Sequence, residues 1–469
     1  MPDRKTRVLW VTFDFPPRLS AGMFRPIRIY KYLDKSSFEV DFVTHGRALR
    51  FQGAVHDDSL LAEVDPPPRV CRVPALIPHD LLPALVARLR PHRRRAPEQR
   101  LASPALRPAA VPSAPQAHRR GPAGALYRRV AMLLYFPDHF FAWGWLAAFA
   151  SVILWIRRRY DVVYTTSHPE SAHLAGLALK LLGVRWVVDY RYGGPLWVKE
   201  IVGYRKSPAR ERVERRYQGW VLSRADAVIT QSEPIRADFC RIFALDPDRV
   251  RVIPSGYDEQ DFLPAKVASA PFTKQDSDVH VMHVGTMEGI SAGERWHIVD
   301  ALNGLHGALR ALGRELVVHA VGSDVFGQER AHAAFEYRHH GVVVHWRLAA
   351  YLAAADGYLL STVDVVQGFI PSKLWEYLRA GGPMLVAGPQ DDVWRIADEA
   401  GVALHLTLTD GRTPSPAELA AALVARLQAR PPLHPSVVRH SWESRAQAVQ
   451  EVFRRVAVTA GAREGEARA

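Results

Sequence analysis

The 469-residue sequence contains only two cysteines, Cys71 and Cys240. Two cysteines give neither a disulfide framework nor the spacing of a metal site, and such sparse use is typical of a reducing compartment. The sequence also lacks the GxGxxG fingerprint of many nucleotide-binding domains, a cluster of carboxylates, and an apolar leader before its first strand. From these absences we expect a cytoplasmic protein that uses neither a metal ion nor a cofactor.

Positive charge and apolar residues, in contrast, are plentiful. The formal net charge is +13 and the hydrophobic fraction is 48%, which suits anionic partners and fills the cores of two or three domains. Much of the charge lies in arginine runs within an Arg/Pro/Ala-rich stretch at about residues 74–135, which we expect to be a disordered insertion. No nucleic-acid reader motif accompanies the charge, so nucleic acid is not an expected partner.

Residues 139–156 carry no charged side chain apart from His139, and arginines occupy positions 157–159. This segment is rich in Phe and Trp, and its length is at the lower limit for a membrane span. A span would interrupt an α/β domain, so two other interpretations are favoured. The segment is either a buried helix that leads into the next strand or a helix in the membrane interface, with the arginines beside it.

Short apolar runs alternate with helical patterns along most of the chain. This alternation predicts parallel sheets covered by helices on both faces, with ligands at the carboxyl ends of the strands. A polar, proline-containing connection at residues 264–277 separates two such halves. Strands are expected at residues 7–13, 38–44, 70–73, 161–166, 185–190, 225–232 and 250–253, and, in the second half, at 279–284, 316–321, 342–345, 358–360 and 384–387.

The stretch 367–387 reads as loop, helix and strand. Pro371 suits the first turn of the helix, and Ser372 is placed for a hydrogen bond at its N-terminus. Lys373 and Glu376 then share one face near the helix start. The helix dipole and the lysine favour an anion there, and the carboxylate of Glu376 suits two ribose hydroxyls, so together they suggest a nucleotide. The alternative is an ordinary surface helix with a solvated Lys–Glu pair.

Residues 371–385, with the sequence PSKLWEYLRAGGPML, resemble the donor-binding segment of glycosyltransferase family 4, and residues 161–191 and 225–262 resemble the same family. The resemblance implies a retaining enzyme with the α/β GT-B fold, in which two Rossmann-like domains face a central cleft. The implied domains are an N-terminal acceptor domain at 1–262, a C-terminal donor domain at 263–437, a helix at 438–460 that returns to the first domain, and a disordered tail at 461–469.

The resemblance also assigns roles to individual residues. Arg191 and Lys373 would be catalytic, because both could stabilise the charge that grows on a nucleoside diphosphate leaving group. Arg191 would contact substrate or phosphate and would not transfer protons, because a guanidinium does not deprotonate. The implied donor-binding residues are Gly285, Thr286, Arg295, Gly368, Phe369, Ser372, Lys373 and Glu376, and the implied cleft or acceptor residues are Gly22, Arg25 and His168.

Two positions depart from the family pattern. Gly368 stands where many members have a first glutamate that contacts the sugar, and Tyr192 stands where many have an aspartate. The donor sugar therefore stays open. The implied reaction is sugar transfer from a nucleotide-sugar, in cell-surface polysaccharide or glycolipid synthesis. A lipid-linked acceptor and an anionic membrane surface are further candidate partners, with the protein on the inner face of the cell membrane. The alternatives are a non-catalytic GT-B binding protein and a GT-B sugar-nucleotide epimerase.

Overall fold

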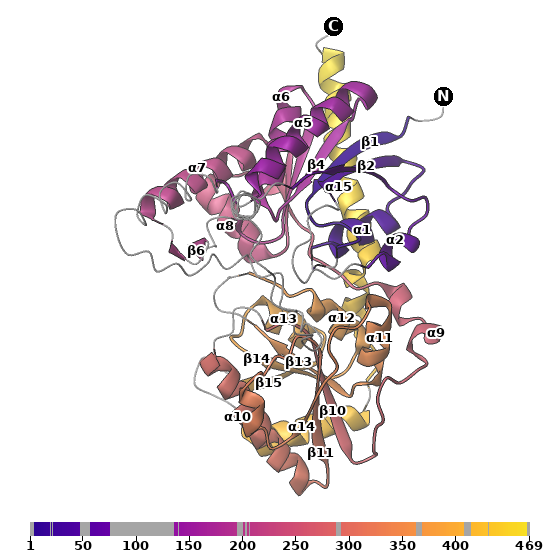
Figure 1. Cartoon of the computed structure of the whole chain (residues 1–469), viewed down its shortest axis with the longest axis vertical. Helices are drawn as coiled ribbons and strands as arrows, with labels where there is room; N and C mark the ends of the chain where they lie inside the picture. Colours follow the sequence, from indigo (N-terminus) through magenta and orange to yellow (C-terminus); the bar gives the residue numbers. More distant parts are fainter. Residues whose placement is uncertain are drawn as a thin grey trace, which may run out of the picture. The chain divides into compact units, whose positions relative to one another are not determined.

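The structure is a computed structural model, and its chain divides into two units (Figure 1). Unit 1 holds the residues up to Pro254 and those from Ala446 onward, whereas unit 2 holds Ser255–Arg445. The described residues are 4–18, 20, 22–46, 57–75, 136–138, 140–194, 200–201, 204–205, 207–287, 292–362, 368–407, 414–429 and 431–466. The insertion expected at 74–135 lies outside these ranges except for its first two residues.

In the described part of unit 1, seven parallel strands form one sheet in the order β3-β2-β1-β4-β5-β8-β9. β1 pairs with β2 on one side and with β4 on the other. The strand order therefore reverses at β1, which is the switch point of a doubly wound sheet. The strands are β1 (Thr6–Thr12), β2 (Phe38–His45), β3 (Arg69–Val73), β4 (Val162–Thr166), β5 (Arg185–Tyr190), β8 (Ala227–Thr230) and β9 (Val250–Val252).

Helices cover both faces of this sheet (Figure 1). Ser207 and Ser232 cap the N-termini of two of them. Each serine hydroxyl accepts a hydrogen bond from the backbone amide three residues later, that of Arg210 or Ile235. The helices are α1 (Phe24–Tyr32), α2 (Ser59–Ala62), α5 (Phe141–Arg158), α6 (His173–Leu181), α7 (Pro208–Arg224), α8 (Glu233–Phe243) and, from Ala446 onward, the C-terminal α15 (Trp442–Glu466), with short turns η1 (Glu170–Ala172) and η3 (Pro247–Arg249) and the hairpin β6 (Glu200–Ile201) and β7 (Tyr204–Arg205).

In the described part of unit 2, six parallel strands form a second sheet in the order β12-β11-β10-β13-β14-β15. The strands are β10 (Asp278–Gly285), β11 (Glu315–Gly322), β12 (Glu336–His339), β13 (Gly357–Ser361), β14 (Met384–Ala387) and β15 (Ala403–Thr407). Its helices are α9 (Pro264–Val267), α10 (Ala292–Ala311), α11 (His345–Ala354), α12 (Lys373–Ala380), α13 (Asp392–Glu399) and α14 (Pro416–Ala429), with turns η4 (Glu259–Phe262), η5 (Glu329–His332) and η6 (Pro435–His440).

The expectation of an α/β fold with two Rossmann-like sheets is confirmed, but one expected strand is wrong. The apolar residues 342–345 are not a strand, and His345 begins α11. The edge strand is β12, whose Glu336 and Arg338 side chains pair with each other. An edge strand has one unpaired side and tolerates charge. β12 therefore carries no apolar run that would indicate a strand in the sequence.

Helix α15 packs on the sheet of unit 1. The Phe453 ring meets Phe38 on β2 and Tyr164 on β4 edge-to-face, with centroids 5.9 and 5.2 Å apart. The helix continues through residues 461–466, for which no regular structure was expected, and residues 467–469 lie outside the described ranges.

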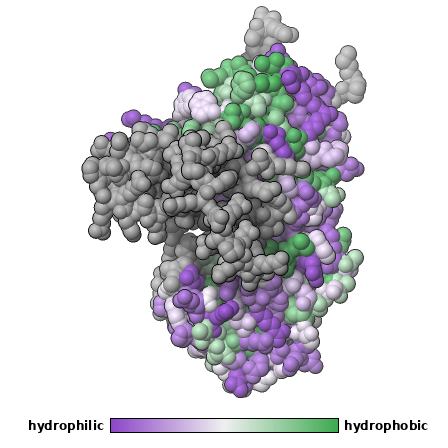
Figure 2. Space-filling view, viewed as in Figure 1, coloured by the Kyte–Doolittle hydropathy of each residue, from purple (hydrophilic) through white to green (hydrophobic). Residues whose placement is uncertain are grey.

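Helix α5 has a buried face and an exposed apolar face. Trp143, Ala147 and Ser151 are buried, and α5 packs along α6. Trp145 and Phe149 are 63% and 68% exposed, and Figure 2 shows apolar residues gathered over this part of unit 1. Among the described helices, none combines the length and apolar character that crossing a membrane requires, so α5 is not a span.

Candidate active site

Two glycines end adjacent strands at the carboxyl edge of the sheet in unit 2. Gly285 ends β10 with φ +84° and Gly322 ends β11 with φ +112°, and the two are partners in register. A Cβ atom on Gly322 would lie 3.0 Å from the Gly285 carbonyl oxygen. Glycine is therefore required on conformational grounds at both positions, and the bare backbone leaves room for a ligand to approach.

Lys373 is the first residue of α12 and reaches back to the end of β10. Its Nζ donates to the Thr286 carbonyl at 2.8 Å and lies 3.3 Å from Nε2 of His283. His283 is buried, and its Nδ1 lies 3.0 Å from the Leu359 carbonyl. Burial and the nearby lysine hold the pKa of His283 well below its ordinary value. A neutral imidazole therefore donates to Leu359 and accepts from Lys373.

Tyr377 attaches α12 to β10 one turn further along. Its hydroxyl accepts a hydrogen bond of 2.8 Å from the Val284 amide, and burial raises the pKa of the phenol above its ordinary range. Sequence reasoning missed both Tyr377 and His283. A signal existed for His283, because it interrupts the apolar run of β10.

The remaining residues predicted on this stretch lie on the loop before α12 and on its first turns. Ser372 has helical backbone angles and makes no side-chain cap hydrogen bond, so the expected capping role is wrong. Phe369 is 43% exposed, and Glu376 is half-buried on the helix face of Lys373. Gly368 has φ +78°, a conformation that a glutamate adopts only with strain. This backbone suits the glycine that stands at this position.

Arg295 lies on α10, and its Nε is 3.2 Å from a carboxylate oxygen of the buried Glu329. This pair fixes η5 against α10. Contact between Arg295 and a donor phosphate stays a prediction.

The carboxyl edge of the sheet in unit 1 brings together residues that follow three neighbouring strands. The Tyr192 hydroxyl, after β5, is hydrogen-bonded to Nδ1 of His168, after β4. Arg191 is half-buried beside them, where burial lowers its pKa and Asp14, after β1, opposes that change. Gly22 packs on Asp14 so closely that a Cβ atom would lie 1.9 Å from the carboxylate. The sheet thus brings a guanidinium, an imidazole, a phenol and the Asp14 carboxylate to this edge.

Arg25 does not belong to that group. It is 1% exposed, and it binds the Asp189 carboxylate through Nε at 2.6 Å and Nη2 at 3.2 Å. Its Nη1 donates to the Pro254 carbonyl at 3.1 Å, and Tyr164 donates to the same carboxylate at 2.6 Å. The expectation of a ligand-facing Arg25 is corrected accordingly, because Asp189 inside β5 requires a buried cation.

Two acidic residues at this edge were not predicted. Asp138 accepts hydrogen bonds of 2.7 Å from the amides of Phe140 and Ser171, while burial raises the pKa of its carboxyl group. Glu170 is buried, and its carboxylate adds to the effect of burial in raising the pKa of Tyr192. No spacing in the sequence links Asp138 to the loop after β4, so only the fold reveals it.

Comparison with known proteins agrees with this architecture. The model of Glycosyltransferase Family 4 matches residues 106–261. A search of curated proteins finds no match. The stretch around Lys373 lies outside the matched residues.

Three solved structures are similar along nearly the whole chain. A glycosyltransferase from Rickettsia africae is 12% identical with a TM-score of 0.57, and the match covers 96% of this chain and 98% of that one. A UDP-forming trehalose-phosphate synthase from Burkholderia xenovorans is 12% identical with a TM-score of 0.54, covering 96% and 100%. A UDP-GlcNAc 2-epimerase from Methanocaldococcus jannaschii is 10% identical with a TM-score of 0.51, covering 96% and 99%.

Identities this low establish the fold and leave the reaction open. The predicted resemblance is confirmed by the family model over the matched residues and by the shared fold over the rest. The chain is a GT-B protein of the α/β class whose residues 106–261 match Glycosyltransferase Family 4.

Proposed function

We propose that this protein is a retaining, metal-independent glycosyltransferase that moves a sugar from a nucleoside-diphosphate sugar to an acceptor. The observation that carries the proposal is Lys373, held at the start of α12 against the glycine-ended strand β10. The family match and the glycosyltransferase structures of the same fold support it. We further propose a place in cell-surface polysaccharide or glycolipid synthesis.

The donor site follows from the charge that the reaction creates. As the glycosidic bond breaks, negative charge grows on the departing diphosphate, and a fixed cation at that position lowers the barrier. Lys373 would supply this charge, and the backbone at Gly285 and Thr286 would allow the phosphates to approach. Glu376, on the same face of α12, would accept hydrogen bonds from the ribose hydroxyls.

The acceptor side would use the carboxyl edge of the sheet in unit 1. Arg191 would bind a phosphate or another anionic group of the substrate as a permanent cation. His168, oriented by the Tyr192 hydroxyl, would contact a hydroxyl of the acceptor. We assign no general base, because sugar transfer with retention needs none within the protein if the leaving phosphate takes the proton.

A panel of nucleoside-diphosphate sugars tests this function. The donor should raise the unfolding temperature, by an amount that grows with its concentration. Transfer is then followed with candidate acceptors, and NMR of the product gives the anomeric configuration. A product with the opposite configuration contradicts retention, and loss of activity with chelator contradicts metal independence.

Epimerisation is the second candidate, because the epimerase from M. jannaschii shares the fold over nearly the whole chain. Incubation of the protein with the stabilising nucleotide-sugar, without acceptor, distinguishes the two reactions. A new sugar isomer in the NMR spectrum supports epimerisation. Binding with neither transfer nor isomerisation supports a non-catalytic protein.

We also propose that the protein is cytoplasmic and attached to the inner face of an anionic membrane, where a lipid-linked acceptor is available. Trp145 and Phe149 on α5 would enter the interface. Arg157 follows directly at the end of the helix, where a basic side chain favours anionic lipid. The Arg-rich segment 85–130, which would add attraction, lies outside the described residues.

Flotation with anionic or neutral liposomes, at low and high salt, tests the attachment. Trp145→Ser with Phe149→Ser should abolish salt-resistant flotation. Trp346→Ser, at a 50% exposed tryptophan of unit 2, serves as the control. Absence of flotation of the parent protein at low salt contradicts the proposal, and flotation that survives the double substitution assigns binding to the basic segment alone.

A further inference from the structure

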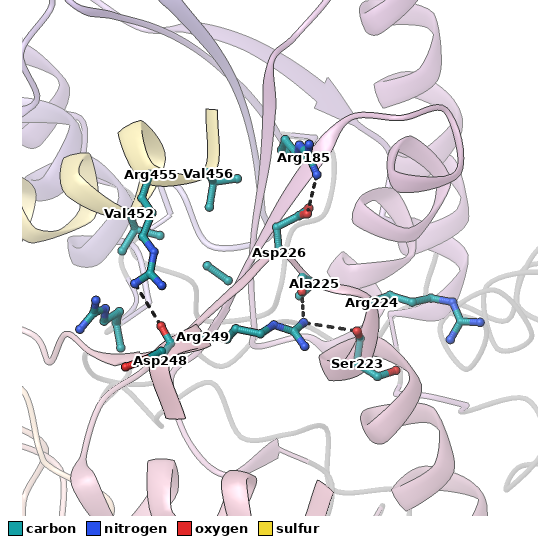
Figure 3. Close-up of a pocket in the computed structure, with 12 residues that line it drawn as sticks. Arg185, Ser223, Arg224, Ala225, Asp226, Asp248, Arg249, Val452, Arg455 and Val456 are labelled. Atoms are coloured by element: carbon teal, nitrogen blue, oxygen red, sulfur yellow. Dashed lines mark hydrogen bonds and ion pairs between the residues drawn. The ribbon is translucent and has the colours of Figure 1, made fainter. Parts of the chain in front are cut away.

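A cavity of about 500 Å³ lies in unit 1 at the amino ends of β5, β8 and β9 (Figure 3). This edge of the sheet is opposite the carboxyl edge that holds Arg191. Helix α15 forms one wall through Val452, Arg455 and Val456. The lining is strongly basic, with two aspartates, Asp226 and Asp248, among the described residues and five arginines, namely Arg185, Arg224, Arg249, Arg251 and Arg455.

The Asp226 carboxylate does not neutralise the other arginines of this cavity, because it already accepts hydrogen bonds from three groups. Its carboxylate accepts from Arg185 at 3.1 Å, from Lys180 at 2.6 Å and from the Trp186 amide at 2.7 Å. Two cations and one amide thus share this carboxylate, so it does not pair with the other arginines of the cavity in any hydrogen bond or ion pair of the structure.

Arg249 removes another source of negative potential. The carboxyl end of α7 would repel an anion, because its last carbonyls carry partial negative charge. Nη2 of Arg249 donates to the carbonyls of Ala225, Ser223 and Leu222, the latter two at 3.3 and 3.4 Å. Figure 3 shows Arg249 directed at this helix end.

Two further arginines line the cavity, one on β9 and one on α15. The side chain of Arg251, on β9, is exposed and makes no hydrogen bond or ion pair with any described residue, while its backbone pairs with Ile229 on β8. Arg455, on α15, donates through Nη1 to the Asp248 carbonyl at 3.2 Å, so its guanidinium is oriented beside β9 (Figure 3). Arg224 instead stacks on Trp220, with 4.7 Å between guanidinium and ring centre.

We propose that this cavity binds an anion that carries phosphate groups and that the anion connects Arg251 to Arg455, so that α15 is held on unit 1. A guanidinium presents paired N–H donors that match phosphate oxygens, and an anion relieves the repulsion between neighbouring arginines. The volume is that of a small-molecule site and exceeds what one phosphate needs. A phosphorylated metabolite, polyphosphate or lipid headgroup would satisfy the same chemistry.

Calorimetric titration of the full chain with phosphate, pyrophosphate and tripolyphosphate, at constant ionic strength, tests the site. Affinity should increase with chain length. Arg251→Gln should weaken binding about tenfold, as expected for the loss of charge-assisted hydrogen bonds. The affinity of Arg251→Lys should lie between those of the parent protein and Arg251→Gln, because lysine keeps the charge but lacks the paired donors.

Arg215→Gln is the matched control, since Arg215 is an exposed arginine of α7 that does not line the cavity. Equal weakening in Arg251→Gln and Arg215→Gln would show adsorption to general positive charge and overturn the proposal. Lys373→Ala should leave this binding intact, which separates it from a donor site in unit 2. A melting curve for each variant confirms that it folds.

Hydrogen exchange identifies the source of the anion and its effect on α15. Tripolyphosphate should slow amide exchange in residues 446–457 of the parent protein and not of Arg455→Gln. Protection by phosphatidylglycerol vesicles alone would assign the site to a lipid headgroup, whereas protection by the free anion assigns it to a soluble ligand. Unchanged exchange with both, together with no heat of binding, overturns the proposal.

Discussion

Arg25 in unit 1 and Lys373 in unit 2 both lie toward the carboxyl ends of their sheets, but they are held in different ways. Arg25 is buried and bound twice to the Asp189 carboxylate, so its charge is used within the fold. The contacts of Lys373 include the Thr286 carbonyl and the neutral His283 ring, neither of which carries a charge. We therefore expect Arg25 to serve the fold, and we propose that Lys373 serves an anionic ligand.

Asp189→Asn removes the counter-charge of Arg25 and should have the largest effect, a loss of stability of unit 1. The substitution leaves the Arg25 guanidinium buried without its counter-charge, which costs about 3–5 kcal/mol. Hydrogen exchange of β4 and β5 measures the stability of unit 1 separately from unit 2. Arg25→Met combined with Asp189→Leu should recover much of the loss. A loss below about 1 kcal/mol would show that the pair contributes little, in the range of exposed pairs.

Lys373→Ala removes the cation of unit 2. It should lower the turnover of sugar transfer about 10²–10³-fold, the range for removing one group that stabilises developing charge. The melting temperature of unit 2 should change little. Lys266→Ala, on α9, is the control for loss of a lysine in the same unit. Turnover of Lys373→Ala within a factor of three of the parent protein would show that Lys373 does not serve the leaving group.

Glu376→Ala sharpens the comparison within α12 itself. We expect nucleotide-sugar binding to weaken by about 1–3 kcal/mol, because ribose hydroxyls would lose a charged acceptor. Glu443→Ala removes the same charge from a position on α15 within unit 2. Calorimetry on both variants provides the measurement. Donor affinity equal to that of the parent protein would make Glu376 an ordinary surface residue.

A buried histidine chain gives unit 2 a pH dependence. His319 lies between His280 and His340, with nitrogen–nitrogen distances of 2.8 Å on both sides. Burial and the neighbouring histidines lower the pKa of His319 to about 3. The unfolded chain binds this proton near pH 6.5 and the folded chain does not, so stability falls as the pH drops from 6.5 toward 3, by about 1.4 kcal/mol per pH unit.

Denaturant midpoints of unit 2 between pH 7 and pH 4 measure this effect. His319→Leu should make this dependence less steep by up to about 1.4 kcal/mol per pH unit, because one proton-binding group is removed, while other buried histidines of unit 2 with lowered pKa values, such as His283, keep the rest. A slope in His319→Leu equal to that of the parent protein would contradict the contribution assigned to His319.

The alternating strands and helices, and the face shared by Lys373 and Glu376, could be predicted because each depends on short stretches of sequence. The burial of Arg25 could not, because its partner Asp189 lies 164 residues away and only the sheet brings them together. The polar edge strand β12 could not be predicted for a different reason, because its sequence contains no apolar run. The arginine cavity likewise joins β9 to α15, which are far apart in the chain.

Hydrogen exchange of the full chain with and without a nucleoside diphosphate tests the central claim most directly, with UDP and GDP compared in parallel. We predict slower exchange at residues 283–287 and 372–376, and loss of that protection in Lys373→Ala. Unchanged exchange in both segments at saturating nucleotide, or protection that persists in Lys373→Ala, would contradict it.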